Sequence, residues 1–241
     1  MSSSFGIYLS DEVFNNTFYR NTISSWAAAI VVNGNDTGDS GTVGRIYDNT
    51  FTNDTIITCN GATCADNYYD IILTANASDI TFLNVSFNKS RIAIMPRSGG
   101  NDVAEINNLT VKWYLDAYVN DGANALEGAQ LNVNDSKDIN LFNVTTDSSG
   151  LIATQVITEF TMINGTNSSW YFADDICVDN VNVTCFTPHN ISVNITNYLN
   201  NNLSIVINRS KNITISMNII PSGALYVNIS LPTNDTSVTA N

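Results

Sequence analysis

The sequence predicts an all-β protein, and three features of its 241 residues support that class. Short runs of β-branched and aromatic residues alternate with Asn, Asp and Gly turns along the whole chain. Helical periodicity is almost absent, and only residues 123–130 are suited to a helical turn or two. Hydrophobic residues make up 44% of the chain, which is enough to build a folded core.

The first part of the chain contains a short internal repeat. Residues 16–23 read NTFYRNTI and residues 49–56 read NTFTNDTI, with five of eight positions identical, and a degenerate third copy, SFNKSRI, covers residues 86–92. Apolar runs GIYL, AIVV, DIIL and RIAI lie beside these copies, so each coil can bury its inward residues by stacking on the next, with aligned Asn side chains bonded into ladders. Over about residues 5–95 the pattern resembles the right-handed parallel β-helix repeat family, which implies a β-helix in residues 1–105. A β-sandwich with coincidental Asn turns is the alternative.

The second part changes character near Asn107. A long alternating strand, LTVKWYLDAYVND, is followed by the motifs Ala129–Val133 and Thr146–Gly150 and by Tyr198. Over about residues 107–218 these features resemble the Ig-like or transthyretin-like sandwich related to carboxypeptidase regulatory domains, with Asn197 where the family has Gly. The resemblance implies an Ig-like β-sandwich over residues 106–219 and no enzymatic activity.

Two segments stand apart from that pattern. Residues 164–186 depart from the family core and are expected to form an inserted hairpin arm. The tail, residues 220–241, holds one alternating strand at Ala224–Leu231 between two prolines and ends in a flexible stretch. Because a lone strand is unstable in water, this one is expected either to return to its own sandwich or to complete the sheet of a neighbouring subunit.

Asn-X-Ser/Thr triplets are the strongest functional signal. The chain has 37 Asn and nineteen such triplets, none with Pro in the middle, whereas composition alone would give roughly seven or eight. We expect most of them to carry N-linked glycan on outward positions, with Asn-rich turn chemistry as the alternative. They begin at Asn15, Asn35, Asn53, Asn76, Asn84, Asn88, Asn108, Asn134, Asn143, Asn164, Asn167, Asn182, Asn190, Asn194, Asn202, Asn208, Asn212, Asn228 and Asn234.

The four cysteines form two close pairs. Cys59 and Cys64 bracket one loop and Cys177 and Cys185 another, and each spacing favours a local disulfide over a metal site. Disulfides and glycan acceptors together indicate an extracellular or cell-surface location. The sequence contains neither a secretory signal nor a membrane-spanning run, so we expect residues 1–241 to belong to a longer or processed product.

Charge excludes one large class of partners. The net charge is −13 and the nine basic residues are scattered, which argues against nucleic acid and anionic membrane surfaces. Charged residues make up only 13% of the chain, so Asn, Ser, Thr and attached sugars would provide the polar surface.

Candidate catalytic and ligand residues do not form a motif. Acidic and basic groups for polysaccharide cleavage are Asp36, Asp39, Asp66, Asp70, Asp79, Arg91 and Arg97, but each carboxylate is better explained as a turn residue. The adjacent Asp174 and Asp175 would point to opposite faces of a strand. Residues 33–41 resemble a calcium loop without its bidentate Glu, and a plain Gly-rich loop is preferred, so we expect no cofactor other than glycan.

The single histidine and the three tryptophans also favour structural roles. His189, next to Pro188, is expected to be a turn residue rather than a catalytic base. Trp113 is expected in the core and Trp170 is the best candidate for contact with another molecule, while Trp26 could be core or a sugar-stacking platform.

Two function classes follow. The first is a non-enzymatic structural subunit of a glycosylated extracellular filament, sheath or surface layer, self-assembled as a homopolymer. The second is a carbohydrate-binding or polysaccharide-degrading β-helix protein, for which no active site is visible. The chain resembles archaeal surface proteins that join β-helix repeats to Ig-like modules with dense sequons, and that resemblance favours the first class.

Overall fold

The structure is a computed structural model that describes residues 5–10, 12–25, 28–34, 46–58, 69–74, 77–95, 107–163, 166–167, 172–173 and 176–221. Regular structure in these residues consists of strands and one 3₁₀ helix, so the predicted all-β class is confirmed. The elements are β1 (Phe5–Ser10), β2 (Thr17–Tyr19), β3 (Thr22–Ser25), β4 (Ala28–Asn33), β5 (Ile46–Tyr47), β6 (Thr50–Thr52), β7 (Thr55–Thr58), β8 (Tyr69–Thr74), β9 (Ala77–Ser78), β10 (Ile80–Leu83), η1 (Lys89–Arg91), β11 (Ile92–Met95), β12 (Asn108–Asn120), β13 (Gln130–Asn134), β14 (Asn140–Thr145), β15 (Gln155–Ile163), β16 (Thr166–Asn167), β17 (Phe172–Ala173), β18 (Ile176–Cys177), β19 (Val183–Cys185), β20 (His189–Asn194), β21 (Asn201–Ile205) and β22 (Lys211–Ser216).

Strands β1 to β11 form four parallel sets, which we call the parallel stack. The sets are β1-β4-β8-β11, β2-β6-β10, β3-β7 and β5-β9. Thr17 pairs with Thr50 and Thr50 with Thr81, so successive coils are offset by 33 and then 31 residues. The first two repeat copies therefore lie in register on each other, as the sequence predicts, while the right-handed β-helix itself stays a prediction.

Left-handed residues mark two corners of the parallel stack. Six non-glycine residues there have φ between 53° and 57°, a conformation that Asn and Asp tolerate better than most side chains. They fall into two columns one coil apart, Asn15, Asp48 and Asp79 in one and Arg20, Asn53 and Asn84 in the other.

Polar side chains link the coils beside these corners. Asn49 Oδ1 accepts hydrogen bonds from the backbone N–H and the side-chain amide of Asn16, both at 3.1 Å. Asn84 donates to Asn53 Oδ1 at 2.7 Å. These contacts are the predicted ladders, and they satisfy polar groups that the apolar core cannot.

Aromatic rings fill the centre of the parallel stack. Phe18, Phe51 and Phe82 stack with ring centroids 4.6 and 4.8 Å apart, and Phe51 and Phe82 are fully buried. The third repeat copy is therefore centred on Phe82, and its alignment on residues 86–92 is wrong. Phe87 instead packs at a tilt against Phe82, just before η1.

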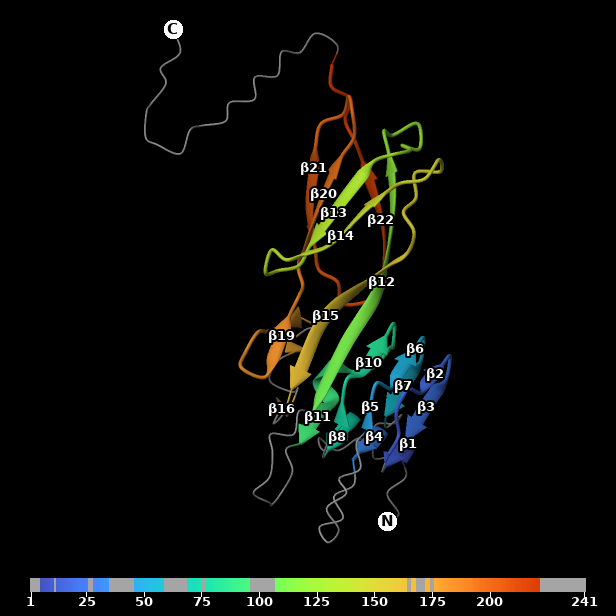
Figure 1. The fold of residues 1–241 in the computed structure, drawn as a ribbon, viewed down its shortest axis with the longest axis vertical. Helices are drawn as coiled ribbons and strands as arrows, with labels where there is room; N and C mark the ends of the chain where they lie inside the picture. Colours follow the sequence, from blue (N-terminus) through green and yellow to red (C-terminus); the bar gives the residue numbers. More distant parts are fainter. Residues whose placement is uncertain are drawn as a thin grey trace, which may run out of the picture.

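Strand β12 joins the two parts of the molecule (Figure 1). Its residues 109–112 pair in parallel with β10 of the stack, and its residues 115–120 pair in parallel with β22. Strand β15 pairs antiparallel with residues 108–115 of the same strand, through a bulge between Val111 and Lys112. The predicted domain boundary at 105/106 thus falls just before a strand that both parts share.

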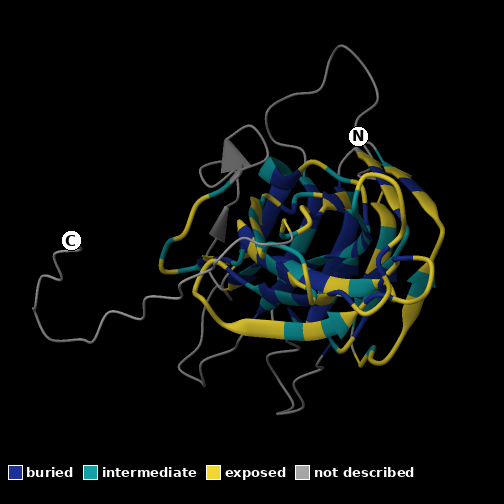
Figure 2. Cartoon of the chain, turned by 90° about the horizontal axis from the view of Figure 1, so that it is seen from above, coloured by how far each residue is buried: buried dark blue, intermediate teal, exposed yellow. Residues whose placement is uncertain are grey.

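The part beyond the stack, which we call the upper part, contains the antiparallel sheet β14-β13-β20-β21 and the second half of β12 with β22. Alternate residues of β13 and β20 are buried, and they belong to the same hydrophobic cluster as the interior of the stack. Seen from above, buried residues lie at the centre of the molecule and exposed ones at the periphery (Figure 2). The Ig-like assignment of this part stays a prediction.

Backbone conformation and local hydrogen bonds explain the residues found at two turns of the upper part. In the turn 146–150, Gly150 has φ +74°, and a Cβ there would lie 2.5 Å from the backbone oxygen of Val119. Thr146 Oγ1 donates to Leu126 O at 2.5 Å and accepts from Ala129 N–H at 2.9 Å. Asn197 has φ +71°, a left-handed conformation that Asn tolerates better than most non-glycine residues.

The inserted segment 164–186 is only partly a free hairpin. Strands β17 and β18 pair with each other, as an arm would. However, β16 pairs antiparallel with β11 and β19 pairs antiparallel with β15, so the insertion extends two sheets of the body. The strand predicted at 224–231 lies outside the described residues.

Candidate functional site

The sequon asparagines in the described residues avoid the interior. Their exposure is known for thirteen of the nineteen, and none of these is buried. The two buried Asn, Asn49 and Asn107, both lie outside the triplets. The exposed ones are Asn15, Asn88, Asn143, Asn190, Asn194, Asn202 and Asn212, and the half-buried ones are Asn53, Asn84, Asn108, Asn134, Asn182 and Asn208.

Five of these residues share the outward face of the sheet β14-β13-β20-β21, which we call the Asn face. They are Asn134, Asn143, Asn190, Asn194 and Asn202. Strand pairing brings them close, since Asn134 lies opposite Asn190 and Asn202 lies opposite Ser192. Glycans on this face would therefore crowd one another on a single side of the upper part.

The remaining triplets lie outside the residues whose side chains are described. They are those of Asn35, Asn76, Asn164, Asn167, Asn228 and Asn234.

One of the two predicted disulfides is present. Cys177 and Cys185 are bonded, with Cα atoms 5.9 Å apart, and the bridge ties β18 to β19. Cys59 and Cys64 lie outside the described residues. The bridge confines the loop that holds Asp179, whose pKa is lowered by a hydrogen bond from the Cys185 N–H and by its ion pair with Lys137.

The acidic candidates in the described residues serve the fold. Asp70 Oδ2 accepts the Asn88 N–H at 2.7 Å, and Asp79 accepts the Asn108 side-chain amide at 3.2 Å. Arg91 lies in the last turn of η1. Most of the Gly-rich loop 33–41 lies outside the described residues, as do Asp36, Asp39, Asp66, Arg97, Asp174 and Asp175. Across the described part of the chain, no three His, Cys, Asp or Glu residues gather as a metal site.

His189 is not the turn residue that its neighbour Pro188 suggested. It begins strand β20, pairs with Ile205 and is fully buried. Burial lowers its pKa to about 4, and the nearby charge of Asp135 opposes this shift only in part. The imidazole is therefore neutral at pH 7 and belongs to the core.

Of the three tryptophans, Trp113 is described, and it is buried in the core as predicted. Trp26 and Trp170 lie outside the described residues. The indole N–H of Trp113 donates to Glu159 Oε2 at 2.5 Å, which leads to a polar cluster that the sequence did not reveal.

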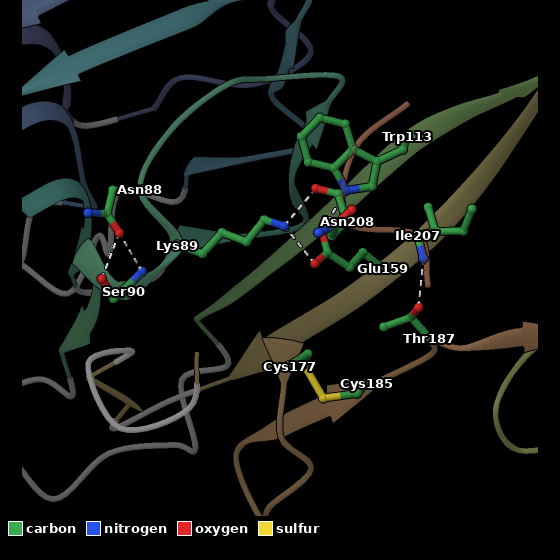
Figure 3. Close-up of polar contacts among 10 residues, drawn as sticks. All are labelled: Asn88, Lys89, Ser90, Trp113, Glu159, Cys177, Cys185, Thr187, Ile207 and Asn208. Carbon is green, nitrogen blue, oxygen red and sulfur yellow. Dashed lines mark hydrogen bonds and ion pairs between the residues drawn. A yellow bond between two sulfur atoms is a disulfide. The ribbon is translucent and has the colours of Figure 1, made fainter. Parts of the chain in front are cut away.

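Lys89, Glu159, Trp113 and Asn208 converge where the stack meets the upper part (Figure 3). Lys89 Nζ lies 2.7 Å from Glu159 Oε1 and 2.8 Å from the backbone oxygen of Asn208. Lys89 and Glu159 are almost completely buried, and the ammonium lies 5.3 Å from the centre of the Trp113 ring. We call this group the buried cluster.

Four separate segments bring the buried cluster together, and β12 is the one that carries Trp113. Lys89 begins η1, which Asn88 caps by accepting the Ser90 N–H at 3.0 Å. Glu159 lies in β15, where the bulge opposite Val111 leaves Glu159 and Phe160 both buried. Asn208 lies in the β21–β22 loop, which is held by a bond from Ile207 N–H to Thr187 Oγ1 at 2.8 Å. A Glu in the apolar run VITEFTM was the one sequence signal available.

Comparisons with known proteins add little. No family model and no curated protein matches the chain. Among solved structures, one titled "The Bacillus anthracis TIE protein" is similar at 12% identity and a TM-score of 0.31, over 46% of this chain and 18% of that one. A likeness this weak carries no argument about fold or function. Among the described residues, no helix is both long and apolar enough to cross a membrane.

Proposed function

We propose that this chain is a non-enzymatic structural subunit of an extracellular, heavily N-glycosylated surface assembly, such as a filament, sheath or surface layer. The observation that carries the proposal is the distribution of sequon Asn. All thirteen of known exposure avoid the core, and five of them share the Asn face. Acceptor sites must be accessible to a glycosylating enzyme, and the seven exposed positions meet that requirement.

The chemistry of the surface supports the same proposal. Only 13% of residues are charged, so the outward strand positions rely on Asn, Ser and Thr for solubility. Glycans would supply the hydration that charges provide in most extracellular proteins. The Cys177–Cys185 bridge is consistent with an oxidising compartment.

The open end of the parallel stack supports self-assembly. In the described residues β1 pairs with β4, β2 with β6 and β3 with β7, so the outer edge of each of these strands is a candidate for the addition of another strand. Exposed aromatic side chains lie on or next to this first coil, at Phe5, Tyr8, Phe14 and Tyr19. A neighbouring subunit that continued the sheets would pair the edges and cover the rings. We therefore propose head-to-tail contacts, with the first coil or the tail strand 224–231 at the junction, giving an open filament.

Mass spectrometry of native material tests the glycosylation. We expect an intact mass well above the 26.2 kDa of the polypeptide, falling after enzymatic or chemical deglycosylation. Peptide mapping should locate glycan first at Asn143, Asn190, Asn194 and Asn202 of the Asn face. An unmodified native mass would refute this part of the proposal.

Electron microscopy tests the assembly. Native protein should form filaments or layers, and deletion of residues 220–241 should leave a folded monomer that no longer polymerises. Filaments that persist after the deletion would exclude the tail strand as the junction. A native protein that stays monomeric at high concentration would exclude assembly, and cleavage of an acidic polysaccharide would favour the enzymatic class instead.

A further inference from the structure

The buried cluster contains reactive groups that a purely structural ion pair would not need. A buried ammonium and carboxylate lose much of their hydration, and a pair of this kind adds little net stability compared with apolar side chains of the same volume. In addition, Asn208 Oδ1 is buried and has no hydrogen-bond partner. An unsatisfied amide oxygen is costly in an apolar interior. An amine, a carboxylate and an unpaired carboxamide thus lie together in a site shielded from water.

The positions of the three groups match an aminolysis reaction. Lys89 Nζ already contacts the backbone oxygen of Asn208, and Cγ of the same residue is only two bonds from its Cα. Glu159 Oε1 lies 2.7 Å from Nζ and can accept its proton, while Oε2 is held by the Trp113 N–H. Holding reactants in a fixed arrangement replaces a slow bimolecular encounter by an intramolecular step.

We propose that Lys89 Nζ and Asn208 Cγ join in an intramolecular amide bond, with Glu159 as the catalytic proton carrier. The Lys89 ammonium gives a proton to Glu159, and the resulting free amine attacks Cγ to form the new C–N bond. The bond from Cγ to Nδ2 then breaks. Two of the three ammonium protons pass through Glu159 to Nδ2, which leaves as ammonium, and Glu159 ends ionised. The step is balanced without any oxidant, reductant or co-reactant.

The surroundings of Lys89 and Asn208 favour this reaction. Transfer of a proton from Lys89 to the adjacent Glu159 yields the neutral amine, which is the nucleophile. Exclusion of water also protects the new amide bond from hydrolysis. The loop that carries Asn208 is fixed on both sides, since Ile207 bonds Thr187 and Ser210 Oγ donates to Asn84 Oδ1 at 2.7 Å. The loop therefore holds the backbone of Asn208 against the amine, 2.8 Å from Nζ at the backbone oxygen.

The bond would link residues 119 positions apart in the chain. It would tie η1 of the parallel stack to the β21–β22 loop of the upper part, across the shared strand β12. A subunit pulled along its long axis would then be held at this junction by a covalent bond. The same reaction consumes Nδ2 of Asn208, so this sequon would carry the cross-link instead of a glycan.

Intact-mass spectrometry tests the proposal directly. The full chain is produced in a host without N-glycosylation and reduced before measurement, so that neither glycan nor disulfide changes the mass. We expect the folded wild type to be lighter than its sequence mass by one ammonia, with a branched peptide joining Lys89 and Asn208. A folded wild type at full sequence mass would overturn the proposal.

Variants separate the proposed bond from other losses of ammonia. Lys89→Met, Glu159→Gln and Asn208→Ala should each keep the full mass of their sequences. Asn208→Ala retains the Lys89–Glu159 pair and is the variant expected to fold most readily, with a lower midpoint of thermal unfolding than the wild type. Lys137→Met, which removes an exposed ion pair with Asp179, should still lose ammonia. If Lys89→Met also loses ammonia, Asn208 has cyclised on its own backbone and the proposal is wrong. Glycan on Asn208 in native protein would contradict it equally.

Discussion

The parallel stack and the upper part solve the same problem of burying short strands in different ways. In the stack, each strand pairs with the strand one coil later, so identical positions recur along the axis and side chains of one kind lie on each other. In the upper part, neighbouring strands run antiparallel, and inward apolar residues alternate with outward Asn and Ser. In the stack, Asn side chains therefore bond to one another between coils, whereas in the upper part they point outward on the Asn face.

This difference determines what an asparagine contributes. Asn49 in the stack is buried and makes four hydrogen bonds, to Asn16, Val13 and Tyr47. Asn143 in the upper part is exposed and lies opposite Asn132 on the Asn face. An Asn in the position of Asn49 stabilises the fold, whereas an Asn in the position of Asn143 is accessible for modification. Substitutions in the two parts should therefore have unequal effects.

The largest effect is expected from Phe51→Ala. Phe51 lies between Phe18 and Phe82 at the centre of the stack, so its truncation leaves a cavity worth about 3–5 kcal/mol in the free energy of unfolding. Because β12 and a continuous core join the two parts, we expect one cooperative transition in urea, shifted to lower concentration.

Phe14→Ala is the matched control, since Phe14 is exposed and stacks on Tyr47. Phe14→Ala should lower the free energy of unfolding by well under half of the loss expected for Phe51→Ala. Two separate transitions in Phe51→Ala, with the upper part still folded, would contradict the shared core.

A change of pH should act through His189 in the upper part. Its folded-state pKa is about 4, against 6.5 in the unfolded chain, so the unfolded state binds a proton first as the pH falls. The corresponding stability is fully present above about pH 6.5 and is lost progressively towards pH 4. The total is on the order of 3 kcal/mol, at about 1.4 kcal/mol per pKa unit.

Urea unfolding of the wild type and of His189→Gln between pH 7 and 4.5 isolates this contribution. His189 is the single histidine of the chain, so carboxylate titration is common to both proteins and cancels in the difference. Parallel stability curves for the two proteins would show that the buried imidazole titrates normally.

A smaller effect is expected from Asn49→Ala. This change leaves the Asn16 N–H without its acceptor and removes one of the two hydrogen bonds at each of the Val13 and Tyr47 backbone oxygens, at a cost of about 1–3 kcal/mol. Asn143→Ala, measured in the same way on unglycosylated protein, should change stability by less than about 0.5 kcal/mol. Equal effects from the two substitutions would remove the distinction between internal and external asparagines.

The sequence anticipated features that depend on short-range pattern. The first two repeat copies, the buried alternation of β12 and the Cys177–Cys185 bridge can all be recognised from residues close together in the chain. The third coil is easily misaligned because Ile80 stands where Asn16 and Asn49 begin the Asn-Thr-Phe motif, and because Phe87 is a second Phe close by. His189 was misjudged because Pro188 is typical of turns, whereas the strand that follows begins at once.

The buried cluster cannot be predicted from a short-range sequence pattern. Lys89 and Asn208 each lie inside an Asn-X-Ser triplet, where glycosylation is the natural interpretation. Their contact spans 119 residues and depends on the bulge that turns Glu159 inward. Without the tertiary structure, neither Lys89 nor Asn208 stands out from its neighbours, and Glu159 is marked only by the apolar residues around it.

The sharing of β12 also has an evolutionary consequence. Modular surface proteins often change by exchange of whole domains, which requires a boundary where few contacts cross. Here a cut before residue 107 would remove the strand that covers the edge of β10, and a cut after residue 120 would remove the partner of β22 and most of the partner of β15. Neither half could be recombined cleanly with a foreign partner. The two parts should therefore be inherited together.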